Sequence, residues 1–174
     1  EEQIVTADVA LETISGAALA GSKAQPGLAV RGYELREQIG EGAFGIAYRA
    51  YQPSVGREVA IKVIRPEYAD DPAFIRRFEA QAQLVARLEH PHIVPLYDYW
   101  REPGAAYLVM RLMRGGSLDH VLESSALTSD HALQVAEQMA GVLQTAHAHE
   151  VVHRDIKPSN ILIDDDGNAY LSDF

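Results

Sequence analysis

The sequence predicts an α+β fold in which a strand-rich part is followed by a mostly helical part. Between residues 33 and 111, short segments of alternating or β-branched apolar residues are separated by Gly and Pro turns, which is typical of strands. After Gly115-Gly116 the pattern becomes helical as far as about His149. Apolar residues make up 47% of the 174 residues, so the chain is expected to fold around a core.

Five strands are expected in the first part. The first alternates apolar and polar residues, as a half-buried strand does, and a Gly-rich turn separates it from the second. The third follows a turn at 53–56 and carries a run of β-branched residues, which favour strands. The expected strands cover residues 33–39, 46–51, 58–64, 93–100 and 106–111.

One helix is expected between the third and fourth strands. Asp70 or Asp71 is predicted to cap its first turn, and Pro72 lies just inside that turn, where its missing N–H costs nothing. The helix is predicted to run to about Leu88, before the next proline.

The second part is predicted to contain a long helix and then two short strands. Thr128 or Ser129 is the expected cap of the helix. Residues 161–163 and 169–171 are expected to be strands, and residues 164–168 are expected to form the turn between them.

The first residues differ in composition from the rest of the chain. Residues 1–31 are rich in Ala, Gly, Ser and Thr, and we expect a linker or the tail of an upstream domain there. Residues 32–174 are expected to form a single domain. The chain begins with Glu1 rather than Met, so we expect the natural N-terminus, and additional domains of the parent protein, to lie outside it.

The bulk composition excludes several classes of function. With 15 Lys and Arg against 25 Asp and Glu, the net charge is −10, which argues against nucleic acid as a partner. The absence of cysteine excludes disulfides, a thiolate zinc site and a cysteine nucleophile, and it fits the cytoplasmic location that we expect. No apolar run approaches the roughly 18 residues of a membrane-spanning helix, so no membrane segment is expected.

Residues 40–45 form a Gly-x-Gly-x-x-Gly string. Dinucleotide-binding folds use the same string between a strand and a helix, whereas here it is predicted to join two strands. A hairpin over phosphates fits this context, because glycine lets backbone N–H groups approach oxygen atoms closely. An ordinary glycine-rich hairpin fits the string equally well when it is taken alone.

Lys62 lies in the middle of an apolar strand, in the string Val59-Ala60-Ile61-Lys62. A buried ammonium group is costly unless it meets an opposite charge, so Lys62 is a candidate binding residue. The alternative is a lysine whose stem is buried and whose charge reaches solvent from an edge strand.

The segment His153-Arg154-Asp155-Ile156-Lys157-Pro158-Ser159-Asn160 is the most specific feature of the sequence, and Asp173-Phe174 ends the chain 18 residues after Asp155. Asp155 is a candidate to accept or orient a hydroxyl proton, and Lys157 shares its face across an extended segment. Asn160 and Asp173 offer the hard oxygen ligands that Mg²⁺ prefers.

These three motifs, over residues 33–174, resemble those of bacterial, eukaryote-like Ser/Thr protein kinases. The resemblance implies a protein-kinase-like two-lobed fold, with a complete N-lobe of a five-stranded antiparallel sheet plus one helix, and a partial helical C-lobe. It also implies transfer of the γ-phosphoryl group of Mg-ATP to hydroxyls of protein substrates. Lys157-Pro158 is typical of Ser/Thr rather than Tyr acceptors.

The resemblance further implies roles for individual residues. Asp155, Lys157 and Lys62 would be catalytic, and Lys62 would pair with the α- and β-phosphates. Asn160 and Asp173 would hold Mg²⁺. Met110 would guard the adenine pocket, and the backbone of residues 111–113 would form the hinge. The residues expected to contact ATP are Gly40, Gly42, Phe44, Gly45, Ala47, Ala60, Lys62, Met110 and Leu112.

The sequence departs from the family pattern at several positions. Gln81 stands where the helix usually offers a glutamate to the strand lysine, and a neutral partner loses on the order of 1 kcal/mol. Ala47 replaces the valine that usually packs on adenine. The chain ends at Phe174, before the expected activation segment, so we expect residues 1–174 alone to be inactive. A nucleotide-binding pseudokinase and a small-molecule phosphotransferase are the alternative functions.

Overall fold

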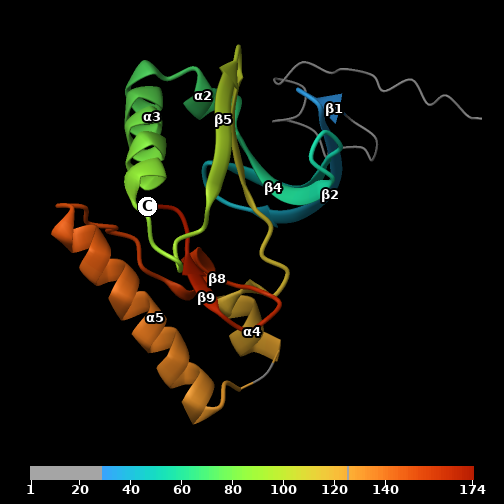
Figure 1. The fold of residues 1–174 in the computed structure, drawn as a ribbon. Coiled ribbons are helices and arrows are strands. Elements are labelled where there is room, and N and C mark those ends of the chain that lie inside the picture. The colour runs from blue at the N-terminus through green and yellow to red at the C-terminus, as the bar shows by residue number, and fades with distance from the viewer. Residues whose placement is uncertain (1–28, 125) are drawn as a thin grey trace, which may run out of the picture.

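The computed structural model of the protein describes residues 29–124 and 126–174. It has the predicted α+β architecture, with a curled antiparallel sheet and its helices in one part and a long helix with a small sheet in the other (Figure 1). Most of the predicted linker, residues 1–28, lies outside the described residues. The remaining residues 29–31 include a short strand that joins the large sheet.

The large sheet has six strands in the order β1-β2-β3-β4-β6-β5. All five predicted strands are present, and β1 is an addition at the edge. The fourth predicted strand begins at Leu96 rather than residue 93, because the residues before it pair with β9. The strands are β1 (Ala29–Val30), β2 (Tyr33–Glu41), β3 (Gly45–Gln52), β4 (Arg57–Ile64), β5 (Leu96–Glu102) and β6 (Ala105–Arg111).

One face of this sheet carries a core of aliphatic and aromatic side chains. Tyr48, Ile61 and Tyr107 are fully buried in it. Trp100 stacks on Tyr107 with ring centroids 4.6 Å apart and on Tyr33 at 5.9 Å, so three strands share one aromatic stack. This core fixes which side chains of β3 and β4 point to the opposite face.

Two helices follow β4, namely α2 (Pro66–Ala69) and α3 (Pro72–Arg87). The Asp71 carboxylate accepts a hydrogen bond from the Ala73 N–H at 2.8 Å, as predicted for the cap of α3. Ile75 and Phe78 of α3 are buried against the sheet. The four-residue helix α2 was not predicted, because one turn is too short to show a helical period.

The second part contains a three-stranded sheet in the order β7-β8-β9 and three helical segments. Thr128 caps α5 by accepting a hydrogen bond from the His131 N–H. The buried side of α5 packs on the small sheet, with Met139 and Val142 in the same core as Ile161 and Leu171. The elements are β7 (Gly116–Ser117), α4 (Leu118–Ser124), α5 (Ser129–Ala148), the 3-10 turn η1 (Pro158–Asn160), β8 (Ile161–Ile163) and β9 (Ala169–Leu171).

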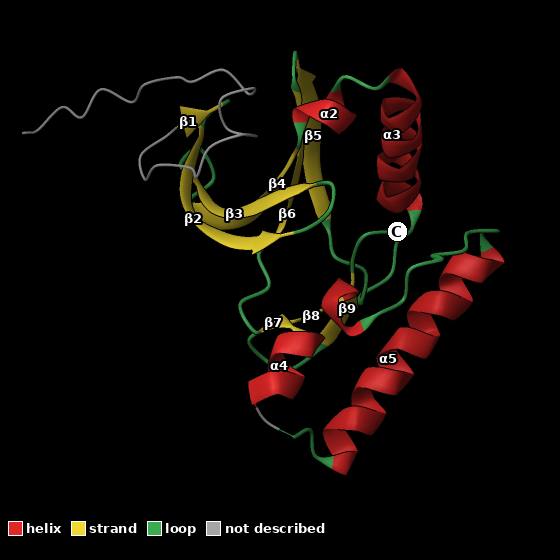
Figure 2. Cartoon of the chain, turned by 180° about the vertical axis from the view of Figure 1, so that it is seen from behind, coloured by secondary structure: helices red, strands yellow, loops and turns green. Residues whose placement is uncertain are grey.

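The two parts meet at the loop before β5 and at the segment after β6. The Val94 N–H donates to the Leu171 carbonyl, and the Leu171 N–H donates to the His92 carbonyl, so this loop pairs with β9. Figure 2 shows the connection from β6 down to β7 on the side opposite α3 and α5. The loop and the connection together place the end of β9 below the large sheet.

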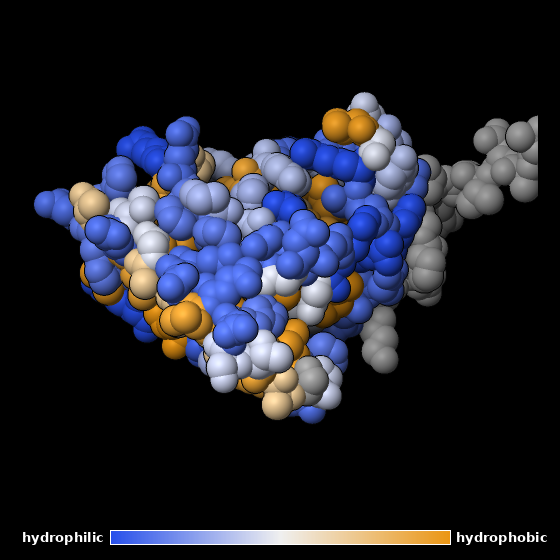
Figure 3. All heavy atoms as spheres, turned by 60° about the horizontal axis from the view of Figure 1, so that its bottom comes forward, coloured by the Kyte–Doolittle hydropathy of each residue, from blue (hydrophilic) through white to orange (hydrophobic). Residues whose placement is uncertain are grey.

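The face formed by the lower part mixes polar and apolar side chains (Figure 3). Leu122 of α4 is 48% exposed and Leu133 of α5 is 60% exposed. Within the described residues, no helix has both the length and the apolar character needed to cross a bilayer.

Candidate active site

Lys62 of the large sheet and Asp173, which follows the small sheet, are in direct contact. The Lys62 Nζ lies 2.7 Å from the Asp173 Oδ1, and the lysine side chain is 20% exposed. Lys62 is on β4, which lies between β3 and β6, so it is not on an edge strand. The alternative of a lysine reaching solvent from an edge is therefore wrong, and its charge meets a carboxylate.

Four of the predicted nucleotide contacts lie together on the face of the sheet that carries Lys62. Ala47 is directly opposite Lys62 in the β3–β4 pair, and Ala60 is directly opposite Met110 in the β4–β6 pair. Directly opposed residues, and residues two apart on a strand, share a face. The small side chains of Ala47 and Ala60 thus leave this face of the sheet uncovered beside Lys62. Leu112, another predicted contact, follows directly after β6.

The Gly-rich string forms the turn between β2 and β3. The Gly42 N–H donates to the Gly45 carbonyl at 2.9 Å and closes the turn. A Cβ on Gly45 would lie 2.2 Å from the Val63 carbonyl oxygen, so close packing on β4 requires glycine there. A Cβ on Gly42 would meet nothing within 4 Å, and one on Gly40 would make only ordinary contact, so packing does not explain these two glycines.

Phe44, at the tip of this turn, contacts the helices. Its ring packs on Tyr68 with centroids 5.2 Å apart and on Phe74 at 5.6 Å, and the ring remains 49% exposed. The Arg65 N–H also donates to the Phe44 carbonyl at 3.0 Å. The glycine turn is therefore held against α2 and α3 on its outer side.

Asp155, Lys157 and Asn160 form one hydrogen-bonded group. The Lys157 Nζ donates to the Asp155 Oδ2 at 2.8 Å, and the Asn160 Nδ2 donates to the same oxygen at 3.1 Å and to the Asp155 carbonyl at 2.8 Å. The bond from Lys157, followed by that from Asn160, holds the pKa of the Asp155 carboxyl below its usual value. Asp155 is therefore an exposed, ionised carboxylate at neutral pH.

His153 connects this group to the segment that carries Asp173. The ring is 6% exposed, and its Nδ1 accepts a hydrogen bond from the Asp155 N–H at 3.2 Å. The other nitrogen, Nε2, lies 2.8 Å from the Ser172 carbonyl and is therefore the atom that carries the proton. The ring edge also packs on Phe174 at 4.8 Å. His153 thus ties the backbone of Asp155 to the residue that precedes Asp173.

The chemistry of the available oxygens fits a magnesium site at Asn160 and Asp173. Asn160 is buried, and because its amide nitrogen is engaged with Asp155, its Oδ1 is the atom that can face a cation. The Ser172 N–H donates to the Asn160 carbonyl at 2.9 Å, which fixes Asn160 next to the residue that precedes Asp173. An amide oxygen and a carboxylate are hard oxygen ligands of the kind that Mg²⁺ prefers, and Mg²⁺ usually keeps waters and takes only one or two protein ligands.

Two residues of the site have unusual backbone conformations. Arg154 has φ 67° and Asp173 has φ 57°, both in the left-handed region that non-glycine residues seldom adopt. Such conformations cost on the order of 1 kcal/mol and cluster at functional sites. Both lie next to His153 or its partner Ser172, whose hydrogen bonds hold the two segments in place.

Gln81 belongs to α3, but its side chain lies outside the described residues. Its effect on the site remains a prediction.

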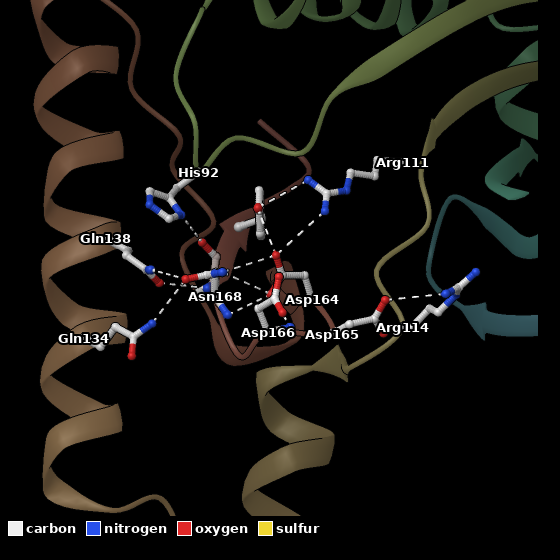
Figure 4. A network of polar contacts seen from close by, with 11 residues as sticks. His92, Arg111, Arg114, Gln134, Gln138, Asp164, Asp165, Asp166 and Asn168 are labelled. Carbon is white, nitrogen blue, oxygen red and sulfur yellow. Dashed lines mark hydrogen bonds and ion pairs between the residues drawn. The ribbon is translucent and has the colours of Figure 1, made fainter. Parts of the chain in front are cut away.

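A polar network that the sequence pattern did not predict joins the hinge, the β8–β9 turn and α5 (Figure 4). The predicted turn at 164–168 is present, and Asp164 accepts hydrogen bonds from the N–H groups of Asp166 and Asn168. Arg111 approaches Asp164 from the hinge, and Gln138 of α5 donates to Asn168. Only the turn at residues 164–168 could be recognised from the local sequence, because its partners in the network are distant along the chain.

Comparison with known proteins identifies close relatives. The family model described as the protein kinase domain matches residues 33–174. Serine/threonine-protein kinase PknA of Mycobacterium tuberculosis is 43% identical over 148 residues, covering 82% of this chain and 34% of that protein. Serine/threonine-protein kinase PrkC of Bacillus subtilis is 41% identical over 143 residues, covering 82% of this chain and 22% of that protein. The chain thus spans about a third or less of the length of these relatives.

Proposed function

Because this chain belongs to the protein kinase family, we propose that it carries the ATP site of a Ser/Thr protein kinase. The activity is transfer of the γ-phosphoryl group of Mg-ATP to Ser or Thr hydroxyls of protein substrates. The observation that carries the proposal is the 2.7 Å contact between Lys62 and Asp173, because it puts the expected phosphate-binding cation beside the expected metal-binding carboxylate. The names of the relatives support Ser and Thr as acceptors.

ATP would lie between the glycine turn and the face of the sheet that carries Lys62. The small side chains of Ala47 and Ala60 leave room for the adenine beside Met110 and Leu112. Because Gly40 and Gly42 have no side chains, the backbone of this turn could approach the phosphates closely, which gives these glycines the purpose that packing does not. Phe44 and Gly45 would hold the turn over the phosphates.

Asn160 and Asp173 would hold Mg²⁺ through Oδ1 of the amide and the carboxylate oxygens. When bound, the ion neutralises charge on the phosphate oxygens. The Lys62 ammonium and the Asp173 carboxylate form an ion pair. With nucleotide bound, Lys62 would turn to the phosphates and Asp173 to the cation, so each charge keeps an opposite partner.

Asp155 would orient the attacking hydroxyl and accept its proton. Its lowered pKa makes it a hydrogen-bond acceptor at neutral pH rather than a strong base. This suits phosphoryl transfer, which depends on positioning more than on early proton removal. Lys157, 2.8 Å from Asp155, is placed to steady the transferred phosphoryl group.

The test is phosphoryl transfer from labelled ATP by the complete encoded protein, with its Asp155→Asn and Gln81→Glu variants. Asp155→Asn is expected to lower the rate by about 10²- to 10⁴-fold and to leave Mg-ATP affinity within about twofold. Gln81→Glu is expected to raise the rate, because it restores a charged partner for Lys62. Label is expected on Ser and Thr of a protein acceptor and not on small molecules.

Two results would contradict the proposal. ATP binding without transfer by any of the three versions would favour the alternative that Gln81 motivates, a nucleotide-binding pseudokinase. Transfer that survives Asp155→Asn unchanged would show that Asp155 has a different role.

A further inference from the structure

Arg111 ends β6 and begins the hinge, yet its side chain reaches into the lower part of the molecule (Figure 4). The guanidinium carbon lies 5.2 Å from the centroid of the Tyr170 ring, and Nη1 donates to the Tyr170 hydroxyl at 3.3 Å. Nη2 lies 3.8 Å from the Asp164 Oδ2. One side chain therefore contacts the β8–β9 turn at Asp164 and strand β9 at Tyr170.

The groups that receive Arg111 are rigidly held. The Asp164 side chain is 6% exposed and accepts the Tyr170 hydroxyl at 3.0 Å. Its other oxygen accepts the N–H groups of Asp166 and Asn168 at 3.0 and 2.9 Å. Among the residues that the structure describes, Arg111 is the cation recorded within ion-pair distance of this buried carboxylate. The carboxylate is thus desolvated, whereas the Arg111 side chain is 42% exposed, and charge pairing at such a half-buried contact is stronger than between two exposed groups.

The same hairpin carries Asp173. Tyr170 is on β9, three residues before Asp173. The segment between them is pinned by the Leu171 N–H to the His92 carbonyl at 2.9 Å and by the Ser172 N–H to the Asn160 carbonyl at 2.9 Å. Tyr170 therefore belongs to the same short, hydrogen-bonded stretch of backbone that positions Asp173.

A second arginine near the hinge makes a useful contrast. Arg114 reaches Glu58, whose side chain is 16% exposed, at 2.8 Å, and it reaches Asp165 at 3.5 Å. In the second pair both side chains are exposed, by 56% and 65%, and such pairs contribute little because water screens them. The link from Arg114 to the β8–β9 turn is therefore weak.

We propose that Arg111 is a positioning residue that couples the adenine-binding hinge to the metal-binding Asp173 through Tyr170 and Asp164. The proposal rests on the proposed function, since it concerns the same nucleotide site. A ligand that touches only the hinge gains nothing from this coupling. A ligand that must reach the hinge and Asp173 together gains from having the two held at a fixed separation.

The experiment compares two ligands on the complete encoded protein by calorimetry. Adenosine probes the hinge, and a non-hydrolysable ATP analogue with Mg²⁺ probes the hinge and Asp173 together. Arg111→Met is expected to weaken the Mg²⁺ analogue complex by about 5- to 10-fold and to leave adenosine affinity within about twofold, a range typical of coupling between sites. Arg114→Met is the matched control, with both affinities within about twofold.

Tyr170→Phe keeps the ring and removes the hydroxyl that Arg111 and Asp164 share. It is therefore expected to weaken binding of the Mg²⁺ analogue, but not of adenosine, by a smaller factor than Arg111→Met does. The double variant is expected to lose no more than Arg111→Met alone, because both act on one contact. Equal weakening of both ligands by Arg111→Met, or no weakening of either, would overturn the coupling. Failure of the unmodified protein to bind the Mg²⁺ analogue would instead overturn the proposed function.

Discussion

At the residue scale, the site depends on a few side chains whose hydrogen-bond partners allow only one assignment of donors and acceptors. His153 is the clearest case, because the Asp155 N–H can only donate, so Nδ1 must accept and Nε2 must carry the proton toward Ser172. The ring is therefore neutral in this arrangement. It links the backbone of the proposed catalytic residue to the residue before Asp173.

The Lys157–Asp155 contact gives a prediction about a pKa. Lys157→Met is expected to raise the pKa of Asp155 toward the ordinary value of 3.8, because the hydrogen bond from Lys157 is the largest cause of its lowering. The pKa should remain below the ordinary value, since the bond from Asn160 persists. Carbon-detected NMR of labelled aspartate measures it. Lys62→Met, which removes the partner of Asp173, is the control and should leave the pKa of Asp155 unchanged. If both variants shift this pKa, the hydrogen bond from Lys157 is not the cause of its lowering.

Gly45 gives a prediction about packing. Gly45→Ala would place a methyl group 2.2 Å from the Val63 carbonyl oxygen, so β3 and β4 must separate. We expect a loss of about 2–4 kcal/mol in the free energy of unfolding, measured by urea denaturation. Gly42→Ala is the matched control, with a loss below about 1 kcal/mol, because its Cβ would meet nothing within 4 Å. Equal losses in the two variants would show that the backbone accommodates the methyl group.

At the element scale, the long strands and helices could be predicted, and so could the three-residue strands β8 and β9 on either side of the Asp-rich turn, but the two-residue strands and the one-turn helix α2 could not. Alternating and β-branched residues identified β2, β3, β4 and β6, and the Asp-Pro cap identified the start of α3. The two-residue strands β1 and β7 carry no period of their own and exist because a neighbouring strand offers hydrogen bonds. The same reason moved the start of β5, since the residues before it pair with β9.

The aromatic stack on the large sheet gives a prediction about one element. Tyr107 is fully buried, and its hydroxyl has no hydrogen-bond partner within the described ranges. Tyr107→Phe removes that uncompensated polar group and keeps the stack on Trp100, so we expect the free energy of unfolding to rise by about 1 kcal/mol at neutral pH. Urea denaturation measures the change, and a loss of stability would mean that the hydroxyl has a partner.

The same variant should also change the response to alkali. Burial, with a smaller effect of Glu102, raises the pKa of Tyr107 well above the ordinary value of 10.0. The folded state then binds this proton more tightly than the unfolded state, so stability is present below pH 10 and is lost as pH rises above it. The difference between Tyr107→Phe and the unmodified chain should therefore widen above pH 10.

At the scale of the whole molecule, the sequence could name the motif residues but not how they meet. Asp155, Lys157 and Asn160 lie within six positions, so their association could be read locally, and the structure joins them by hydrogen bonds. The Lys62–Asp173 contact spans 111 positions and depends on both sheets being in place. The Arg111 contact with Tyr170 likewise depends on the large sheet meeting the β8–β9 hairpin.

Asp164 joins the hinge and the β8–β9 turn, and it reaches α5 through Asn168, so it gives a prediction about the whole fold. Although burial alone would raise its pKa, the bonds from Asn168 and Tyr170 hold the pKa of the Asp164 carboxyl below the ordinary value of 3.8. A lowered pKa means that the unfolded state takes up the proton first as pH falls. The stability from this carboxylate is thus present above pH 3.8 and is lost as pH falls through the lower, folded value.

Asp164→Asn is expected to lower the free energy of unfolding by about 1–3 kcal/mol at pH 7, because an amide cannot accept all the hydrogen bonds that the carboxylate accepts. The difference in free energy of unfolding between the variant and the unmodified chain should shrink as pH falls below about 4, because the unmodified chain then loses the stabilisation from the ionised Asp164. Urea denaturation at a series of pH values measures both chains. Asp165→Asn, at a 65% exposed neighbour, is the control and should stay within about 0.5 kcal/mol throughout. A deficit in Asp164→Asn that is constant with pH would mean that the carboxylate contributes by shape and not by charge, and that Arg111 meets no ionised partner there.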